Sequence, residues 1–502
     1  MTSNDSAEGL AQTLIVPSET TPGVNLVGFL EGELGLGEVA RKLARALERA
    51  EIPFAAIPYR RTWSRQEHPL GIEPSREVPF DTNLVCLNAD YLHAFLGDVG
   101  AEFFAGRYSI GVWFWESSVF PARNAVGFRF LDEVWVASEY VRRAVAAEAD
   151  IPVHVVPLPI EATDRPNHSR AELGLPEGFM FLFLFDFVSA QRKNPGAVVE
   201  AFKRAFEPGA GPVLVMKSIN GRERKPHLLE ELTAAAAGRP DIHVVDGYLS
   251  AEQKEATIAA CDCYVSLHRS EGFGLTMAEA MAHGKPVIAT GYSGNLEFMD
   301  DENGYLVPYR LVPIPEDWWA YAPGAEWAEP DVDAASAFMR SVYEDRGAAA
   351  ERGVRGRASI LATLSLDRTA TFIAERLSAV RERGAVTPTK GHDPRTAILQ
   401  ASHVLEKGAG ASLAATPGRT PTSFLRRFLR RALWPQLEQQ HRLDRATLDA
   451  LTGLQRSIQH LEQRLHEIEV ARRLADEPPE PSGRGSHAVD RDRSQPRGRS
   501  SD

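Results

Sequence analysis

Short apolar runs alternate with amphipathic stretches over most of this chain, from Val24 to about residue 385. Continuous apolar runs are typical of strands buried on both faces of a parallel sheet, whereas longer amphipathic stretches favour helices. Strands are expected at residues 25–30, 83–87, 109–114, 179–185, 213–216, 243–245 and 263–267. The alternation predicts an α/β protein built on doubly wound parallel sheets.

A proline-rich connection at residues 157–166 divides this pattern into two arrays. A chain of 502 residues is long enough for two domains of ordinary size and additional segments. We therefore expect one Rossmann-like domain at residues 24–168 and a second at residues 169–385. Residues 1–23 are mostly polar and lack periodicity, which predicts a disordered tail.

The segment from Ser270 to Ala280 joins a predicted strand, a glycine turn and a helix that begins near Thr276. Glycine lets the backbone come close to a ligand, and the unpaired N–H groups at a helix N-terminus suit a diphosphate. Glu271 and Glu279 stand eight positions apart, and their carboxylates accept hydrogen bonds from sugar and ribose hydroxyls. The pattern predicts a site for a nucleotide-linked sugar. The alternative is a helix start whose acidic residues only complement the helix dipole.

Glu271 and Glu279 resemble the E-x7-E signature of the family-4 retaining glycosyltransferases (glycosyl transferases group 1), which have the two-domain GT-B fold. Segments on both sides are similar to that family too: residues 134–140, 153–159, 283–290, 291–297 and 303–308. The resemblance covers about residues 24–385. It implies two Rossmann-like domains that face a cleft and a last helix, around residues 369–383, that crosses back to the first domain. It also implies transfer of a sugar from a nucleotide diphosphate to an acceptor hydroxyl, with retention of configuration and without a metal.

The same resemblance implies roles for individual residues. Glu271 is expected to hold the donor sugar and Glu279 the ribose. Arg192 and Lys193 are expected on the diphosphate, where they stabilise the charge that grows as the nucleotide leaves. Without the resemblance, an Arg-Lys pair is typical of a solvated loop, and Asp186 stands where many members carry arginine. The other expected donor-binding residues of this domain are Gly272, Phe273, Gly274, Leu275, Thr276, Lys217 and His268.

In the first domain, the loop Gly32–Glu38 reads G-x-x-G-x-G, which differs from the dinucleotide fingerprint G-x-G-x-x-G. A nicotinamide cofactor is therefore not expected. Gly35 and Gly37 are expected to let the backbone approach the donor phosphates or the acceptor; a tight turn without a ligand is the alternative.

Three polar residues follow predicted strands of the same domain, namely Asn88, Asp90 and Glu116. Ligands of open parallel sheets bind beyond the carboxyl ends of the strands, so these are candidates for the cleft. Trp115-Glu116 departs from the family, since many relatives carry a histidine near this position. Glu116 is predicted to orient an acceptor or donor hydroxyl, and a turn or helix-cap carboxylate is the alternative.

Charge and cysteine content narrow the class of protein. A net charge of −12 argues against general nucleic-acid binding. Cys86, Cys261 and Cys263 form no metal-binding pattern and fit a reducing, cytoplasmic setting. The longest apolar run, residues 179–185, is much shorter than the roughly 20 residues of a membrane-spanning helix. These features predict a cytoplasmic protein, and the resemblance implies an enzyme that needs no cofactor.

Two further segments bear on the chemistry. Asp331-Val332-Asp333 has the spelling of the metal-binding motif of GT-A glycosyltransferases, but it opens a predicted helix, where capping explains both carboxylates. Residues 311–329 form a long predicted loop that contains Trp318, Trp319, Tyr321 and Trp327. This loop is expected either to stack on a sugar or cover the cleft, or to pack on the protein's own surface.

The C-terminal part has a different composition. Residues 386–422 are rich in Gly, Ala, Thr and Pro and are expected to form a linker. Residues 423–436 predict a basic amphipathic helix, which suits either an anionic membrane surface, such as the inner face of the plasma membrane, or docking on protein. Residues 437–475 predict a short coiled coil, for a homo-oligomer or a docking helix, and residues 476–502 a disordered tail.

The expected partners are a nucleotide-diphosphate sugar and a glycan or lipid-linked acceptor, in polysaccharide or surface-glycan biosynthesis. Two other classes stay open from the sequence. A glycoside phosphorylase of the same fold would release sugar 1-phosphate, and a noncatalytic scaffold would bind the donor without turnover.

Overall fold

The structure is a computed structural model that describes residues 14–382, except residues 63, 163–167, 316–320 and 323. The chain divides into two units, residues 1–414 and 415–502, and the second lies wholly outside the described residues. The predicted linker, basic helix, coiled coil and both tails therefore lie outside the description, apart from the end of the N-terminal tail. Trp318 and Trp319 lie outside it as well.

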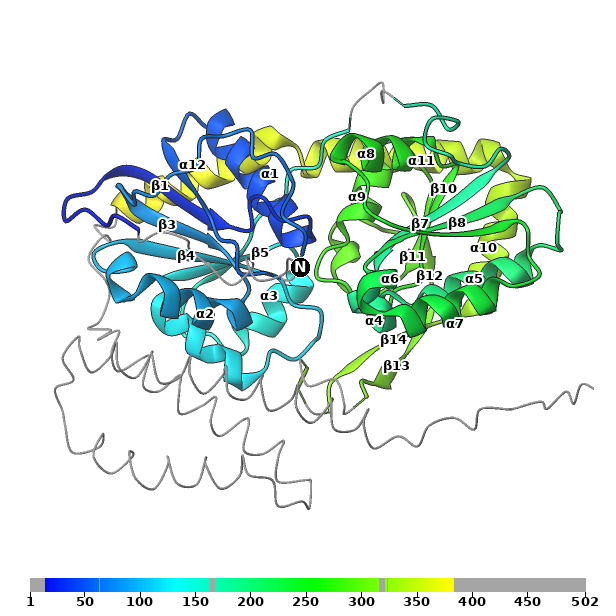
Figure 1. Cartoon of the computed structure of the whole chain (residues 1–502), viewed down its shortest axis with the longest axis horizontal. Coiled ribbons are helices and arrows are strands. Elements are labelled where there is room, and N and C mark those ends of the chain that lie inside the picture. Colours follow the sequence, from blue (N-terminus) through cyan, green and yellow to red (C-terminus); the bar gives the residue numbers. More distant parts are fainter. Residues whose placement is uncertain (1–13, 63, 163–167, 316–320, 323, 383–502) are drawn as a thin grey trace, which may run out of the picture. The chain divides into compact units, whose positions relative to one another are not determined.

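The first domain is built on a six-stranded parallel sheet with the order β2-β1-β3-β4-β5-β6 (Figure 1). Its strands are β1 (Thr21–Gly28), β2 (Phe54–Pro58), β3 (Phe80–Cys86), β4 (Tyr108–Trp113), β5 (Glu133–Val136) and β6 (Val153–Val155). Helices cover both faces: α1 (Gly35–Arg49), α2 (Ala89–Val99), α3 (Glu139–Ala146) and the 3-10 segments η1 (Ala101–Phe103) and η2 (Ala122–Phe130). The predicted doubly wound sheet is confirmed.

The second domain repeats this architecture with the strand order β12-β11-β10-β7-β8-β9 (Figure 1). Its strands are β7 (Met180–Asp186), β8 (Val213–Ile219), β9 (Ile242–Asp246), β10 (Cys263–Ser266), β11 (Val287–Thr290) and β12 (Tyr305–Val307). Its helices up to β12 are η3 (Phe187–Ser189), α4 (Ala190–Lys193), α5 (Pro195–Ala205), α6 (Gly221–Arg224), α7 (Pro226–Ala236), α8 (Ala251–Ala260), α9 (Leu275–Ala282) and η4 (Gly294–Glu297). The strands β7, β8, β10 and β11 are almost entirely buried, which explains why they read as continuous apolar runs.

The prediction of a long loop at residues 311–329 is wrong at both ends of that segment. The strands β13 (Tyr309–Pro313) and β14 (Glu326–Pro330) pair there as an antiparallel hairpin. The sequence pattern missed these two strands because they do not form buried apolar runs. Their exposed positions include Tyr309, Leu311 and Pro313. Tyr321 and Trp327 are buried, and Tyr321 packs against Trp115 of the first domain with a ring separation of 5.6 Å. Both residues pack on the protein itself, and Tyr321 does so between the two domains.

Three helices follow the hairpin: α10 (Val332–Glu344), α11 (Arg346–Thr363) and α12 (Leu366–Glu382). Asp331 caps α10, because its carboxylate accepts hydrogen bonds from the backbone N–H groups of Asp333 (2.9 Å) and Ala334 (3.0 Å). This geometry fits the capping interpretation of the Asp-x-Asp spelling.

The last helix, α12, returns to the first domain and lies beside α1, as the resemblance implies (Figure 1). Phe372 packs edge-on against Trp135 of β5, with ring centroids 5.2 Å apart. Arg376 forms an ion pair with Glu133, a fully buried carboxylate on β5. Glu133 also accepts hydrogen bonds from Tyr108 (3.0 Å) and from Trp135 Nε1 (2.7 Å). This buried carboxylate is therefore an anchor that helps to fasten the end of the second domain to the first.

We expect Arg376→Met to lower the free energy of unfolding by about 3 kcal/mol or more, because it leaves a buried carboxylate without its cation. Urea unfolding followed by tryptophan fluorescence measures the loss. The matched control is Arg368→Met, which removes an exposed arginine from the same helix. The double variant Glu133→Gln/Arg376→Met should recover part of the loss. Equal effects of Arg376→Met and Arg368→Met would contradict the anchor.

Candidate active site

Most charged residues of the candidate site lie where the chain order of the second sheet reverses. In the second sheet the neighbours β7 and β10 are far apart in sequence, and the chain leaves them in opposite directions across the sheet. Arg192 and Lys193 follow β7, and Glu271 follows β10. A crevice beyond the carboxyl ends of the strands at such a reversal is the usual ligand site of an open parallel sheet. The topology thus brings together three residues that the sequence predicted separately.

Local structure explains how the two cations are presented. The short helix α4 contains both of them and ends at Asn194, which has a left-handed conformation (φ 55°). Pro195 then begins α5, a position that suits its fixed φ and missing N–H. Asp186, which departs from the family pattern, caps the turn before α4 by accepting the N–H of Val188 (2.9 Å). Its role in this structure is to shape the loop that carries the cations.

Glu271 is 6% exposed and is the centre of a cluster of charged side chains. Its carboxylate lies 2.5 Å from Lys193 Nζ and 3.2 Å from Arg192 Nη1. Arg192 Nη2 also lies 3.6 Å from Glu116 of the first domain. Two cations thus face two carboxylates, with contributions from both domains. Glu116 takes part in this cluster, and neither a helix cap nor an isolated turn carboxylate describes it.

The ionisation of Glu271 follows from this cluster. Burial alone would raise the pKa of its carboxyl, but the charges of Lys193 and Arg192 outweigh burial and hold the pKa at about 2. Burial alone would lower the pKa of Arg192, but the charges of Glu116 and Glu271 outweigh burial and raise this pKa above its ordinary value. Glu271 and Arg192 are therefore both charged at neutral pH.

The backbone around Glu271 is held on both sides. Its N–H donates to Ser293 Oγ (2.8 Å), and its carbonyl accepts the N–H of Gly294 (2.9 Å). Ser293 itself has φ 79°, a conformation that is uncommon for residues other than glycine. Arg192 Nη1 donates to the carbonyl of Ser270 (2.8 Å). The loop that carries Glu271 is therefore fixed independently of any ligand.

The first domain also holds this loop, through the start of α3. Ser138, the cap of α3, donates to the carbonyl of Gly272 (2.7 Å), and Tyr140 hydrogen-bonds with Ser270 Oγ (3.3 Å). The next backbone N–H, that of Glu139, donates to Glu297 of η4 (2.7 Å). The two domains thus meet directly at the signature loop.

Helix α9 begins right after this loop, and its first turn has no side-chain cap. Gly274, the cap residue, has φ 98°, which a residue with a side chain rarely adopts. Thr276 accepts a hydrogen bond from Tyr264 (2.7 Å), and Phe273 is buried against Phe298. The N–H groups at the start of α9 are thus placed beside the Glu271 cluster, as the sequence predicts for a diphosphate site.

The glycine loop of the first domain lies opposite this helix start. Gly35, the first residue of α1, has Leu275 of α9 as its nearest neighbour, about 4.0 Å from where a Cβ would stand. Gly37 differs, because a Cβ there would come within 2.5 Å of the carbonyls of Gly32 and Phe29. Gly37 is therefore required by the turn itself, whereas Gly35 faces the second domain.

Glu279 lies on α9 and is 7% exposed. One carboxylate oxygen, Oε1, lies 3.0 Å from Lys254 Nζ. The other, Oε2, is buried and has no hydrogen-bond partner within the protein. An acceptor in this state costs free energy unless a donor reaches it, so a ligand hydroxyl would satisfy it.

Two predicted donor-binding residues are not brought into the charged cluster. His268 is fully buried and hydrogen-bonds with Ser266 (3.1 Å), the Tyr292 carbonyl (3.2 Å) and Asn295 (3.1 Å). Lys217 lies within β8 rather than after the strand, because β8 extends to Ile219. Its ammonium donates to the carbonyl of Gly247. In the structure both side chains are occupied by the protein itself.

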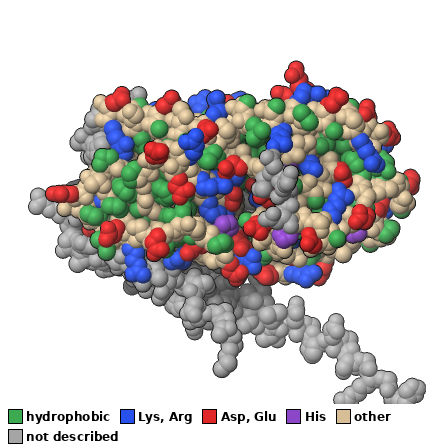
Figure 2. Space-filling view, turned by 90° about the horizontal axis from the view of Figure 1, so that it is seen from above, with side chains coloured by type: hydrophobic (Ala, Val, Ile, Leu, Met, Phe, Trp, Pro, Cys, Tyr) green, Lys and Arg blue, Asp and Glu red, His purple; other side chains and the backbone are tan. Residues whose placement is uncertain are grey.

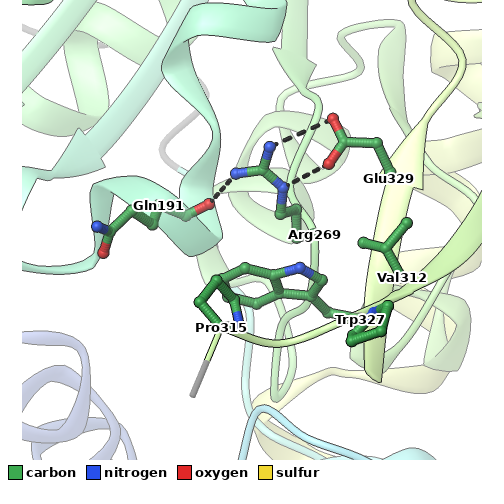
Figure 3. A pocket seen from close by; sticks show the side chains of 7 residues that line it. Gln191, Arg269, Val312, Pro315, Trp327 and Glu329 are labelled. Carbon is green, nitrogen blue, oxygen red and sulfur yellow. Dashed lines mark hydrogen bonds and ion pairs between the residues drawn. The ribbon is translucent and has the colours of Figure 1, made fainter. Parts of the chain in front are cut away.

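A separate pocket of about 330 Å³ adjoins the hairpin (Figure 3). It is lined by Gln191, Arg269, Val312, Pro313, Pro315, Trp327 and Glu329. Arg269 forms a two-pronged ion pair with Glu329 (2.7 and 3.2 Å) and donates to the carbonyl of Gln191 (2.6 Å). Its charged groups are thus paired with each other, and we assign it no ligand.

Among the described residues, no group of three or more His, Cys, Asp and Glu side chains is arranged to hold a metal ion. None of the described helices combines the length and the apolar character that crossing a membrane requires. The three cysteines are buried and unpaired.

Sequence reasoning missed Lys254 and Ser138 as members of the site, and it placed Tyr321 in a loop that could cover the cleft without showing which residue it contacts. Lys254 belongs to no motif, and only its distance from Glu279 identifies it. Ser138 precedes a helix, which signals a cap but not its second bond to Gly272. Tyr321 accepts a hydrogen bond from Arg192, although it is far from Arg192 in sequence. These are long-range contacts, for which a single sequence carries no local signal.

The depressed pKa of Glu271 predicts a pH effect on stability. A carboxyl whose folded pKa is about 2, against an ordinary 4.5, stabilises the fold above pH 4.5, and this stabilisation is lost as the pH falls towards 2. Between pH 6 and pH 3, wild type should lose about 2 kcal/mol more of its unfolding free energy than Glu271→Gln. Urea unfolding at each pH measures this difference, with Glu252→Gln, an exposed carboxylate, as the control. Parallel pH profiles for wild type and Glu271→Gln would refute it.

Known proteins of the glycosyltransferase class are similar in sequence to part of this chain. Residues 179–313 match the family model described as glycosyl transferases group 1. A D-inositol 3-phosphate glycosyltransferase of Arthrobacter sp. (strain FB24) is 30% identical over 201 residues, which are 39% of this chain and 41% of that protein. A protein of the same name from Xylanimonas cellulosilytica is 32% identical over 161 residues, 32% of this chain and 37% of that protein. The chain thus matches about two fifths of the length of these curated relatives.

Solved structures resemble the whole two-domain part. Anabaena HepE in complex with UDP and glucose aligns with a TM-score of 0.53 at 15% identity, covering 72% of this chain and 100% of that chain. Sucrose-phosphate synthase from Thermosynechococcus elongatus aligns with a TM-score of 0.52 at 16% identity, covering 72% and 100%. At this identity the likeness concerns the fold. The two parallel-sheet domains have the GT-B fold, and within them residues 179–313 are similar to the glycosyl transferases group 1 family.

Proposed function

We propose that this protein is a metal-independent, retaining glycosyltransferase of family 4, which moves a sugar from a nucleoside diphosphate to an acceptor hydroxyl. The observation that carries the proposal is the cluster of Glu271, Arg192 and Lys193 at the reversal point between β7 and β10. Close to it lie a helix start without a side-chain cap and, on the same helix, a buried carboxylate oxygen without a partner. The cations and the helix start suit a diphosphate, and the two carboxylates suit the hydroxyls of a sugar and a ribose.

Binding of the donor exchanges partners within the cluster. The diphosphate oxygens take over Arg192 and Lys193 from Glu271, and the N–H groups at the start of α9 add their partial positive charge. Gly35, across from Leu275, gives the first domain a close approach to the same phosphates. Because the leaving diphosphate gains negative charge as the glycosidic bond breaks, these groups stabilise the transition state more than the bound donor.

The carboxylate that is released then serves the sugar. Glu271, freed from the cations, accepts hydrogen bonds from donor-sugar hydroxyls, and Glu116 orients an acceptor or donor hydroxyl from the opposite domain. The bond between the anomeric carbon and the diphosphate oxygen breaks, and its electrons leave with the nucleotide. The acceptor oxygen attacks the oxocarbenium-like carbon from the same face, and its proton passes to the departing diphosphate oxygen.

Glu279 is assigned to the ribose. Its Oε2 is buried without a partner, and a ribose hydroxyl is a donor of suitable chemistry. The base then lies beyond the carboxyl ends of β8 and β9, near Tyr248. The complexes of Anabaena HepE contain UDP, so UDP is the first nucleotide to try.

The wider context is part of the same proposal. The acceptor is a glycan or a lipid-linked sugar in polysaccharide or surface-glycan synthesis, and the enzyme works in the cytoplasm. Residues 423–436 contact the inner membrane surface, and residues 437–475 join copies of the chain. The relatives named for inositol 3-phosphate make a phosphorylated polyol a further acceptor to test.

Calorimetric titration with UDP, GDP and ADP, with and without EDTA, tests the donor site. We expect one of them to bind, EDTA to leave the affinity unchanged, and Glu279→Gln to weaken it about tenfold or more, since a hydrogen bond to a buried charge is lost. Glu252→Gln is the matched control on an exposed position. An affinity for Glu279→Gln equal to that of wild type would contradict the ribose assignment, and no binding of any nucleotide would contradict the proposed function.

A further inference from the structure

Lys254 is a lysine on α8 that lies outside every motif of the sequence. Its ammonium lies 3.0 Å from Oε1 of Glu279, which belongs to the next helix, α9. The lysine side chain is 34% exposed, whereas that of Glu279 is 10% exposed. The carboxylate is thus deeply placed, and the lysine approaches it from the more open side.

This contact places the two carboxylate oxygens of Glu279 in different environments. Oε1 is bound to Lys254, and Oε2 is buried without a partner within the protein. A buried carboxylate with one cation is stable only in the orientation that keeps that cation. Lys254 therefore determines which oxygen is left for a ligand.

A second carboxylate, from the first domain, acts on the same lysine. Burial lowers the pKa of Lys254, but the charges of Glu279 and Glu38 raise it above its ordinary value. Glu38 lies in the first turn of α1 and is held by Arg41 (2.9 Å) and Lys42 (3.5 Å). The ammonium is thus charged at neutral pH and shared electrostatically between the two domains.

The same elements meet around the donor site. Helix α1 begins at Gly35, opposite the first residue of α9. Figure 2 shows Lys and Arg side chains gathered near the middle of the face seen from above, with Asp and Glu side chains around them.

We propose that Lys254 is a positioning residue for the nucleotide ribose: by holding Oε1 of Glu279, it turns Oε2 towards a ribose hydroxyl. The inference rests on the proposed function, because it requires that Glu279 binds a ribose. Lys254 touches neither the sugar nor the phosphates in this assignment. It acts only through Glu279.

A cycle of variants and ligands tests this role. The probes are UDP, 2′-deoxy-UDP and 3′-deoxy-UDP, or the guanosine or adenosine counterparts if wild type binds those instead. In wild type, removing the recognised hydroxyl should weaken binding about tenfold, because Oε2 is left unpaired. In Lys254→Met that penalty should fall to about threefold or less, while the affinity for UDP itself falls about tenfold. Lys254→Arg, which keeps the charge, should retain most of the wild-type penalty.

A structural role alone would not move the deoxy-nucleotide penalty. Because Lys254→Met leaves Glu279 without its cation and could destabilise the fold, the double variant Lys254→Met/Glu279→Gln provides a second measurement. If Lys254 acts through Glu279, the double variant should bind UDP no more weakly than Glu279→Gln alone. The matched control is Lys203→Met, which removes an ammonium that reaches only the carbonyl of Ala235.

The outcomes separate this inference from the function on which it rests. If wild type binds no nucleotide, or Glu279→Gln binds it normally, the donor site itself is wrong. If Glu279→Gln loses affinity and the deoxy penalty, but Lys254→Met keeps both, the donor site stands and the role of Lys254 is refuted. Additive losses in the double variant would refute it as well.

Discussion

The pairing of Glu271 with Arg192 and Lys193 is the interaction on which the account of this site depends. Two cations lie close together at the carboxyl ends of β7 and β10, where like charges would repel each other and lose solvent without compensation. The carboxylate of Glu271 neutralises them, and Glu116 of the first domain adds a second carboxylate near Arg192. A site of this kind is stable without a ligand, yet it contains the charges that a diphosphate needs.

The backbone contacts around Glu271 give this exchange its geometry. Ser293, Gly294 and Ser138 hold the loop from three directions, so that replacement of the Arg192 and Lys193 contacts need not move the main chain. Groups that are already oriented stabilise a transition state without reorganisation. The anchor of α12 at Glu133 serves the same end, because it joins the domains whose residues share the cluster.

The sequence predicts the fold well because most of its sheet strands are buried on both faces. Such strands are visible as apolar runs without any knowledge of their neighbours. Glu271 could be predicted because it follows a recognisable strand and stands in a glycine turn before a helix, whereas the roles of Arg192 and Lys193 were implied only by the family resemblance. The sequence could not show that they neutralise one another, since that depends on the order of strands in the sheet. The hairpin β13–β14 escaped because its strands are partly exposed and bear prolines, and Lys254 escaped because a lysine on a polar helix face looks like any solvated residue.

The most direct test of the account is a crystal structure of the protein with the nucleoside diphosphate that binds it. The account predicts the β-phosphate within hydrogen-bonding distance of Arg192, Lys193 and the first N–H groups of α9. It also predicts a ribose hydroxyl on Oε2 of Glu279, with Glu271 released from both cations. A nucleotide bound elsewhere, with the ion pairs of Glu271 to Arg192 and Lys193 intact, would contradict it.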